Sequence, residues 1–93
     1  MTSIAEKKLQ EKYLQKLPEK MVSLNGFIAT CDKLSSQSLL HKLAGSAGMY
    51  GFPAISKIAS EIEDLIIAGE SLNSANIKTS LKQLYNEIDQ IKK

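Results

Sequence analysis

Apolar residues recur along the chain at intervals of three and four positions, which is the spacing of an amphipathic α-helix. Few prolines and glycines interrupt this pattern, and the segments between them are long enough for helices joined by short turns. Because short connections make sequential helices neighbours, the pattern predicts an all-α protein, an antiparallel four-helix bundle with an additional N-terminal helix. No repeat, low-complexity stretch or long linker divides the 93 residues, so we expect a single domain over residues 1–93.

Turn and capping residues divide the pattern into five predicted helices. Serine fits the N-cap of a helix, proline its first turn, and glycine the left-handed position after its last turn. The predicted bounds are Ser3 to Lys16, Pro18 to Asp32, Ser35 or Ser36 to Tyr50 before Gly51, Pro53 to about Gly69, and Asn73 or Ser74 to the C-terminal end. The first is expected to be a short helix that covers the bundle formed by the other four.

The charged residues argue against a nucleic-acid partner. Twelve basic residues stand against ten acidic ones for a net charge of +2, and all twelve are lysine. The sequence has no arginine, the side chain whose planar fork dominates bidentate recognition of phosphate and guanine. We therefore expect no nucleic-acid partner.

Cysteine usage and hydropathy indicate the compartment. The single cysteine, Cys31, cannot form an internal disulfide, which points to a reducing compartment. It lies on the apolar stripe of the second predicted helix, so we expect a small buried hydrophobe rather than a nucleophile or a ligand. No apolar run approaches the roughly 20 residues needed to cross a bilayer, and Met1 to Lys8 lacks the apolar segment of a signal peptide. We expect a cytoplasmic protein without a membrane partner.

The third predicted helix carries the only histidine of the sequence, His41, beside two glycines. A glycine inside a helix costs about 1 kcal/mol relative to alanine, so we expect something to compensate for Gly45 and Gly48. At about 100° per residue, Leu40 and Leu43 face the core, whereas His41 lies on the flank of the helix. Gly45 and Gly48 follow on the same flank, so the imidazole is bordered by bare backbone and is accessible to a bulky partner.

An acidic residue of the next predicted helix is placed to reach this histidine. If the two helices turn near Phe52, His41 lies eleven residues before the turn and Glu63 eleven residues after it. Glu63 also lies on the flank of its own apolar stripe, whereas Glu61 falls on the other flank and Asp64 opposite the stripe. A carboxylate that accepts a hydrogen bond from one ring N–H fixes the tautomer and leaves the other nitrogen free as a nucleophile.

Each feature also has a simpler interpretation. A histidine on the flank of a helix is commonly a solvated surface residue, and a run of glycine and alanine is commonly a close helix-packing face. Neither interpretation explains why the single histidine stands beside the glycines and level with an acidic residue on the flank of the next helix.

Three short segments carry a family resemblance: His41-x-Leu43-x-Gly45-Ser46-Ala47-Gly48, Gly51-Phe52-Pro53, and Ile58-Ala59-x-x-Ile62-Glu63. At these positions the sequence resembles the histidine-containing phosphotransfer (HPt) domain of bacterial two-component phosphorelays. The resemblance covers about residues 10–92, extends more weakly to Leu17-Pro18-Glu19 and is strongest over residues 36–69. It implies a phosphohistidine carrier that accepts a phosphoryl group from a receiver aspartate or a sensor histidine kinase and passes it to a response-regulator receiver domain.

The resemblance also implies roles for individual residues. His41 would be the phosphorylated residue, Gly45 would make room for the receiver, and Glu63 matches the family's Gln or Glu that bonds the second ring nitrogen. Family members often have lysine three residues after the histidine, where this chain has Ala44, and Lys42 is the nearest basic residue in sequence. The docking face is expected at Gln37, Ser38, Ala44, Gly45, Gly48, Phe52 and Ser56.

No cofactor or metal site is expected on the chain itself. The sequence has no acidic cluster for Mg²⁺ and no glycine-rich loop for ATP, and one histidine with one distant cysteine gives too few metal ligands. We therefore expect a monomeric phosphocarrier that is not an enzyme, with Mg²⁺ supplied by the partner receiver or kinase. The alternative is a helical adaptor that binds a protein through the Gly45 and Gly48 face without phosphorylation.

Overall fold

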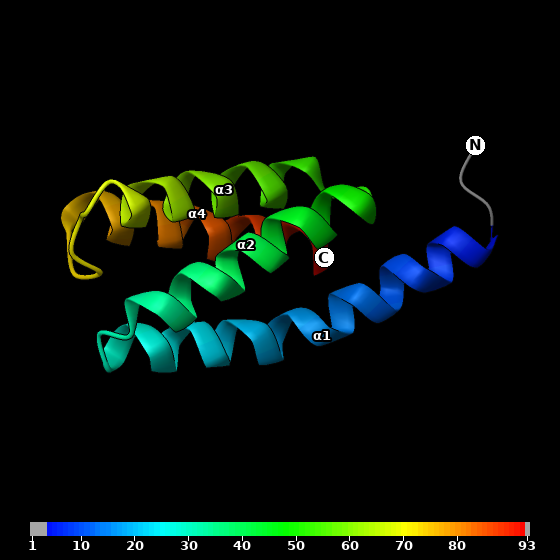
Figure 1. Cartoon of the computed structure of the whole chain (residues 1–93). Helices are drawn as coiled ribbons and strands as arrows, with labels where there is room; N and C mark the ends of the chain where they lie inside the picture. The colour runs from blue at the N-terminus through cyan, green and yellow to red at the C-terminus, as the bar shows by residue number, and fades with distance from the viewer. Residues whose placement is uncertain (1–3, 93) are drawn as a thin grey trace.

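The structure is a computed structural model that describes residues 4–92, and every regular element in that range is an α-helix. The four helices are α1 (Ile4–Ala29), α2 (Lys33–Met49), α3 (Pro53–Ile67) and α4 (Ala75–Lys92). They form an elongated bundle of 42 × 21 × 20 Å, in which the first turns of α1 project past the other helices (Figure 1). The prediction of an all-α helical bundle is confirmed.

The N-terminal region forms one helix where the sequence pattern predicts two. α1 is continuous, with Pro18 in its interior. An interior proline removes a backbone hydrogen bond and costs about 3 kcal/mol. Burial offsets this cost, because Leu17 before the proline and Met21 after it both lie in the core. The predicted boundary between Lys16 and Pro18 is therefore wrong, and no separate N-terminal helix covers the bundle within the described residues.

Two predicted helix stops are confirmed. Gly51 follows α2 with a φ of 88°, and Gly69 follows α3 with a φ of 96°. In each turn the next backbone N–H reaches back five residues, as that of Phe52 does to the carbonyl oxygen of Ala47 at 2.8 Å. At the opposite end of the chain, the predicted cap Ser3 lies outside the described residues.

The turn between α1 and α2 differs from the sequence prediction. Cys31 has a φ of 56° and an exposed side chain, so the expectation of a buried hydrophobe is wrong. The reason is that α1 ends before Cys31 and the chain turns its thiol away from the apolar stripe. Asp32 caps α2 by accepting a hydrogen bond of 3.1 Å from the backbone N–H of Ser35, which lowers the pKa of Asp32. α2 therefore begins at Lys33, and the predicted cap Ser36 is buried inside it.

Each helix buries one apolar stripe, and the four stripes meet in a single core. The buried residues are Tyr13, Leu17, Met21 and Leu24 of α1, Leu40, Leu43 and Ala47 of α2, Ile55, Ala59, Ile62 and Ile66 of α3, Ile77, Leu81, Leu84 and Ile88 of α4, and Leu72 of the last connection. The short connection over residues 50–52 makes α2 and α3 an antiparallel hairpin (Figure 1). Residues on the flanks of these two stripes meet in the groove along the outside of the hairpin.

Tyr13 of α1 packs against the end of this hairpin and is hydrogen-bonded to it. Its hydroxyl is hydrogen-bonded to that of Ser46 at 2.7 Å. Its ring stacks on Tyr50, with centroids 4.7 Å apart, and on Phe52, with centroids 5.8 Å apart. Gln10 adds a hydrogen bond of 2.8 Å from its amide nitrogen to the carbonyl oxygen of Tyr50. α1 is thus held in a fixed position beside the helix that carries the histidine.

Candidate functional site

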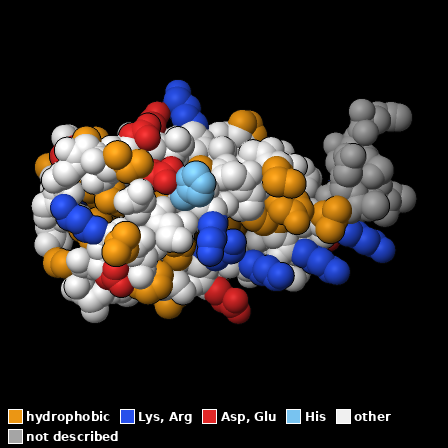
Figure 2. All heavy atoms as spheres, in the orientation of Figure 1, with side chains coloured by type: hydrophobic (Ala, Val, Ile, Leu, Met, Phe, Trp, Pro, Cys, Tyr) orange, Lys and Arg blue, Asp and Glu red, His pale blue; other side chains and the backbone are white. Residues whose placement is uncertain are grey.

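His41 and Glu63 are paired across the groove between α2 and α3. The Nδ1 atom of His41 lies 3.0 Å from Oε2 of Glu63 and 3.3 Å from its Oε1. The histidine side chain is 77% exposed, whereas that of Glu63 is only 13% exposed. The imidazole therefore stands on the surface with a largely buried carboxylate behind it, and Figure 2 shows the histidine projecting from the face of the molecule.

The helix positions follow from the core residues beside them. Leu40 and Leu43 are completely buried on α2, so His41 between them is turned to the flank. Ile62 is completely buried on α3, and Glu63 follows it on the side that faces α2. The structure thus brings together the two side chains that the register of the hairpin predicts to lie level.

The contact with Glu63 determines which ring nitrogen is free. A carboxylate only accepts hydrogen bonds, so Nδ1 of His41 carries the proton that Glu63 binds. In the neutral ring Nε2 then has a lone pair and no proton. Because the side chain is mostly exposed, that lone pair is available to an approaching electrophile.

The two glycines on this flank differ in their surroundings. A Cβ atom on Gly45 would meet nothing within 4 Å, so this position is open space one turn after His41. A Cβ atom on Gly48 would lie 3.4 Å from the hydroxyl oxygen of Ser56. That hydroxyl donates a hydrogen bond of 2.7 Å to the carbonyl oxygen of Ala44. Gly48 therefore lets α3 approach α2 closely, which is a role beyond the expected one of leaving His41 accessible to a partner.

The other expected docking residues fall into three places. Gln37 and Ser38 line a shallow hollow with His41 and Glu63, which we call the histidine hollow. Ala44 and Ser56 meet between α2 and α3 through the hydrogen bond described above. Phe52 is half-buried in the aromatic stack with Tyr13, so it contributes to the packing of α1.

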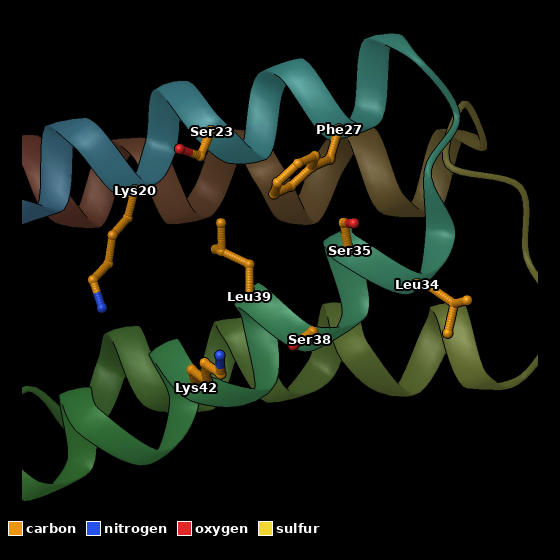
Figure 3. A pocket seen from close by; sticks show the side chains of 8 residues that line it. All are labelled: Lys20, Ser23, Phe27, Leu34, Ser35, Ser38, Leu39 and Lys42. Carbon is orange, nitrogen blue, oxygen red and sulfur yellow. The ribbon is translucent and has the colours of Figure 1, made fainter.

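Lys42 faces a different part of the surface. It lines a groove between α1 and α2, the α1–α2 groove, with Lys20, Phe27, Leu34, Ser38 and Leu39 among the other lining residues (Figure 3). Ser38 and Leu34 line both this groove and the histidine hollow. The two depressions are therefore adjacent on the same face of α2.

Sequence reasoning missed Leu34 as a site residue. Its side chain is 81% exposed, and it lies seven residues before His41 on the same helix. It was missed because the predicted helix starts at Ser35 or Ser36, which leaves Leu34 in a loop. The sequence signal was Asp32, because aspartate is a preferred N-cap residue. Its carboxylate accepts the backbone N–H of Ser35, so the helix starts before Leu34.

No group of three or more potential metal ligands among His, Cys, Asp and Glu occurs within residues 4–92. None of the four described helices is both long and apolar enough to span a membrane.

A comparison with protein families matches residues 8–93 of the chain to the Hpt domain. The match covers most of the sequence, so the chain belongs to the Hpt domain family of two-component phosphorelays. Domains of this family carry phosphoryl groups and interact with receiver domains and histidine kinases. Comparisons with curated proteins and with solved structures gave no match.

Proposed function

We propose that His41 is the phosphorylated residue and that the chain carries a phosphoryl group between a receiver aspartate or a sensor histidine kinase and a response-regulator receiver. The observation that supports this most directly is the 3.0 Å contact of His41 Nδ1 with Glu63 behind an exposed ring. It leaves one nucleophilic nitrogen pointing outward in a domain of the phosphotransfer family.

In the accepting step, the Nε2 lone pair attacks the phosphorus of the partner's aspartyl phosphate. The N–P bond forms while the bond from phosphorus to the aspartyl oxygen breaks, and the aspartate leaves with that electron pair as a carboxylate. No proton has to be transferred, because Nδ1 of His41 already holds one. The phosphorylated ring is then a cation, and the carboxylate of Glu63 stabilises its charge at 3.0 Å.

Passing the phosphoryl group on reverses these steps. The carboxylate of the receiving aspartate attacks phosphorus, and the N–P bond breaks with its electron pair returning to Nε2. Since the ring is protonated at Nδ1, it leaves as a neutral imidazole. The same proton on the same nitrogen therefore serves both directions of transfer.

We assign the remaining machinery to the partner. Negative charge on the transferring oxygens needs a metal ion or cations in the transition state. The described residue that brings a carboxylate to His41 is Glu63, which is already paired with the ring. Ala44 stands where family members often have lysine, and Lys42 lines the α1–α2 groove. We therefore propose that Mg²⁺ and a catalytic cation belong to the receiver or the kinase.

Phosphorylation of the chain tests the proposal. Incubation with a phosphorylated receiver, or with a cognate kinase, ATP and Mg²⁺, should produce an acid-labile and alkali-stable phosphate. The variant His41→Gln should take no label while keeping the helical content and unfolding temperature of the parent, since His41 is exposed. Equal labelling of His41→Gln and the parent would show that another residue is phosphorylated. A parent chain that binds a receiver but takes no label would indicate a helical adaptor.

A further inference from the structure

α1 carries a regular series of lysines. Lys12, Lys16 and Lys20 follow one another at intervals of four residues, so they lie along one face of the helix. At about 1.5 Å per residue the three Cα positions extend over roughly 12 Å. They line surface depressions on the side of α1 that faces α2.

The series continues on α2 towards the histidine. Lys12, Lys16 and Lys20 line a hollow together with Tyr13, which the hydrogen bond to Ser46 fixes in place. Lys20 also lines the α1–α2 groove, where it lies at the same end as Lys42 (Figure 3). We call Lys12, Lys16, Lys20 and Lys42 the lysine row. Figure 2 shows basic side chains extending from beside the histidine along α1.

Acidic side chains are fewer than lysines along this row: Glu19 is next to Lys20 and three residues after Lys16 in sequence, so one carboxylate stands beside four ammonium groups. The whole chain has ten acidic residues, yet none of the described residues lining the two depressions is acidic. Among the described side chains, the carboxylate contact within 4.0 Å is that of Glu63 with His41, and no lysine of the row lies that close to a carboxylate. The row therefore presents a local excess of positive charge on a chain whose net charge is only +2.

The row ends beside the reacting residue. Lys42 is the neighbour of His41 in sequence, and Ser38 and Leu34 line both the α1–α2 groove and the histidine hollow. A partner that covers His41 therefore also covers the near end of the row. The groove between them also has apolar walls, with Phe27, Leu39 and the 81% exposed Leu34. Such walls fit the side chains of a protein better than the headgroups of a lipid surface.

The proposed reaction also defines the charge of the partner. A partner that holds Mg²⁺ beside a phosphoryl-accepting aspartate needs further carboxylates to bind the metal, so its reacting end is acidic. We propose that the lysine row steers and orients an acidic strip of the partner protein, which adjoins the aspartate that exchanges phosphoryl groups with His41. This inference rests on the proposed function and adds the chemistry of the docking partner: a strip of carboxylates about as long as the three lysines of α1, roughly 12 Å.

Electrostatic steering has a recognisable kinetic effect. Complementary charges raise the rate of encounter and lose that effect as salt increases, whereas they leave a reaction within the formed complex largely unchanged. The lysine row should therefore act on the second-order rate constant of phosphoryl transfer and not on the rate at saturating partner.

A pair of matched variants tests this inference. Lys12→Glu with Lys16→Glu reverses two exposed charges of the row, and Lys78→Glu with Lys82→Glu makes the same change at the same spacing on α4. The probe is a set of receiver domains phosphorylated with acetyl phosphate, from which the one that transfers fastest to the parent is used. At low salt we expect the row variant to lower the second-order rate constant about tenfold and the α4 variant to change it about twofold at most.

Three results would overturn the inference. Equal slowing of the row variant and the α4 variant would show that the net charge of the chain sets the rate, and that the partner does not recognise the lysine row specifically. A rate constant of the parent that does not depend on salt would exclude steering. Loss of binding of the row variant to vesicles of phosphatidylserine and phosphatidylcholine, with transfer unchanged, would assign the row to a membrane surface. In all three cases a labelled parent still supports the carrier, whereas a parent without label on His41 overturns the proposed function itself.

Discussion

Glu63 lies behind the ring of His41 and is far more buried than the histidine with which it pairs. The oxygen of the carboxylate is 3.0 Å from Nδ1, and the two side chains are 13% and 77% exposed. A carboxylate with little access to water has few alternatives to the ring N–H as a partner. The pair therefore fixes the orientation of the imidazole while leaving its other side uncovered.

Removing the carboxylate should slow phosphoryl transfer. The pair is one charge-assisted hydrogen bond with an exposed partner, so after allowance for screening by solvent we expect Glu63→Ala to lower the transfer rate about tenfold. The ¹⁵N chemical shifts of the His41 ring should also show a mixture of tautomers in place of the Nδ1–H form. Glu61→Ala is the control, since Glu61 is an exposed residue on the same helix. A Glu63→Ala chain with the transfer rate and ring shifts of the parent would remove the assigned role.

Gly45 should show a conflict between stability and function. Because nothing lies within 4 Å of a Cβ atom there, Gly45→Ala should stabilise the helix by about 1 kcal/mol. Gly45→Leu should keep the chain folded but slow transfer strongly, since its side chain would enter the space beside His41. Thermal unfolding and transfer kinetics measure the two effects.

Gly26 on α1 provides the matched control for Gly45. A Cβ atom there also meets nothing within 4 Å, and the residue belongs to another helix. Gly26→Ala should give the same gain in stability, and Gly26→Leu should leave transfer unchanged. If Gly45→Leu transfers as fast as the parent, open space beside the histidine is not required for docking.

A lysine in place of Ala44 should prolong the life of the phosphohistidine. A cation three residues after His41 would reach the phosphoryl group, and an exposed charge pair worth up to about 1 kcal/mol corresponds to roughly two- to fivefold slower hydrolysis. The half-life of labelled Ala44→Lys, measured in the absence of partner, checks this. Ala44→Met has a side chain of similar length without charge and should hydrolyse at the parent rate. Equal half-lives of Ala44→Lys and Ala44→Met would contradict the electrostatic explanation.

Cys31 should be replaceable by glycine with a gain in stability. Its φ of 56° is the left-handed conformation, which costs a residue with a side chain about 1 kcal/mol or more. Cys31→Gly should raise the free energy of unfolding by up to about 1 kcal/mol, since the greater flexibility of the unfolded chain offsets part of the relief. Cys31→Ser keeps the strained conformation and should show no such gain, which denaturant unfolding can verify.

Alkaline pH should loosen the attachment of α1. Burial raises the pKa of Tyr13, although the hydrogen bond with Ser46 acts in the opposite direction. The folded chain therefore holds the phenolic proton more tightly than the unfolded chain, in which tyrosine has a pKa of about 10. The stability from this group is complete below that pH and is lost as pH rises through the folded value. Tyr13→Phe should show a shallower loss of unfolding free energy above pH 10 than the parent, and parallel curves would count against this account.

The geometry of the His41–Glu63 pair could be predicted because it depends on regular structure. The positions of His41 and Glu63 follow from the helical period and from a short turn at Gly51, whose φ of 88° only glycine adopts easily. Gly69 ends α3 for the same reason. A glycine at the end of an apolar helical pattern has one main role, which is to adopt the positive φ that ends the helix. At these glycines the sequence pattern predicted the structure correctly.

Other features depend on tertiary contacts that no local pattern contains. Pro18 lies within a helix because core residues on both sides of it keep α1 continuous. Cys31 adopts a backbone conformation that usually requires glycine. Because the residue is a cysteine, the sequence contained no indication of a turn at this position. The lysine row joins residues of α1 to Lys42 of α2, and their proximity requires the packing of the two helices. Sequence periodicity showed each helix face separately but not which faces adjoin.

The separation of 22 residues between His41 and Glu63 restricts how this chain can evolve. A single residue inserted into α2 after His41 would rotate the histidine by about 100° and shift it by about 1.5 Å relative to the core behind it. The carboxylate would then face an empty position. Substitutions can therefore change partner preference along the surface of the hairpin, whereas single insertions and deletions within α2 after His41 or within α3 before Glu63 should be absent from functional descendants of this sequence.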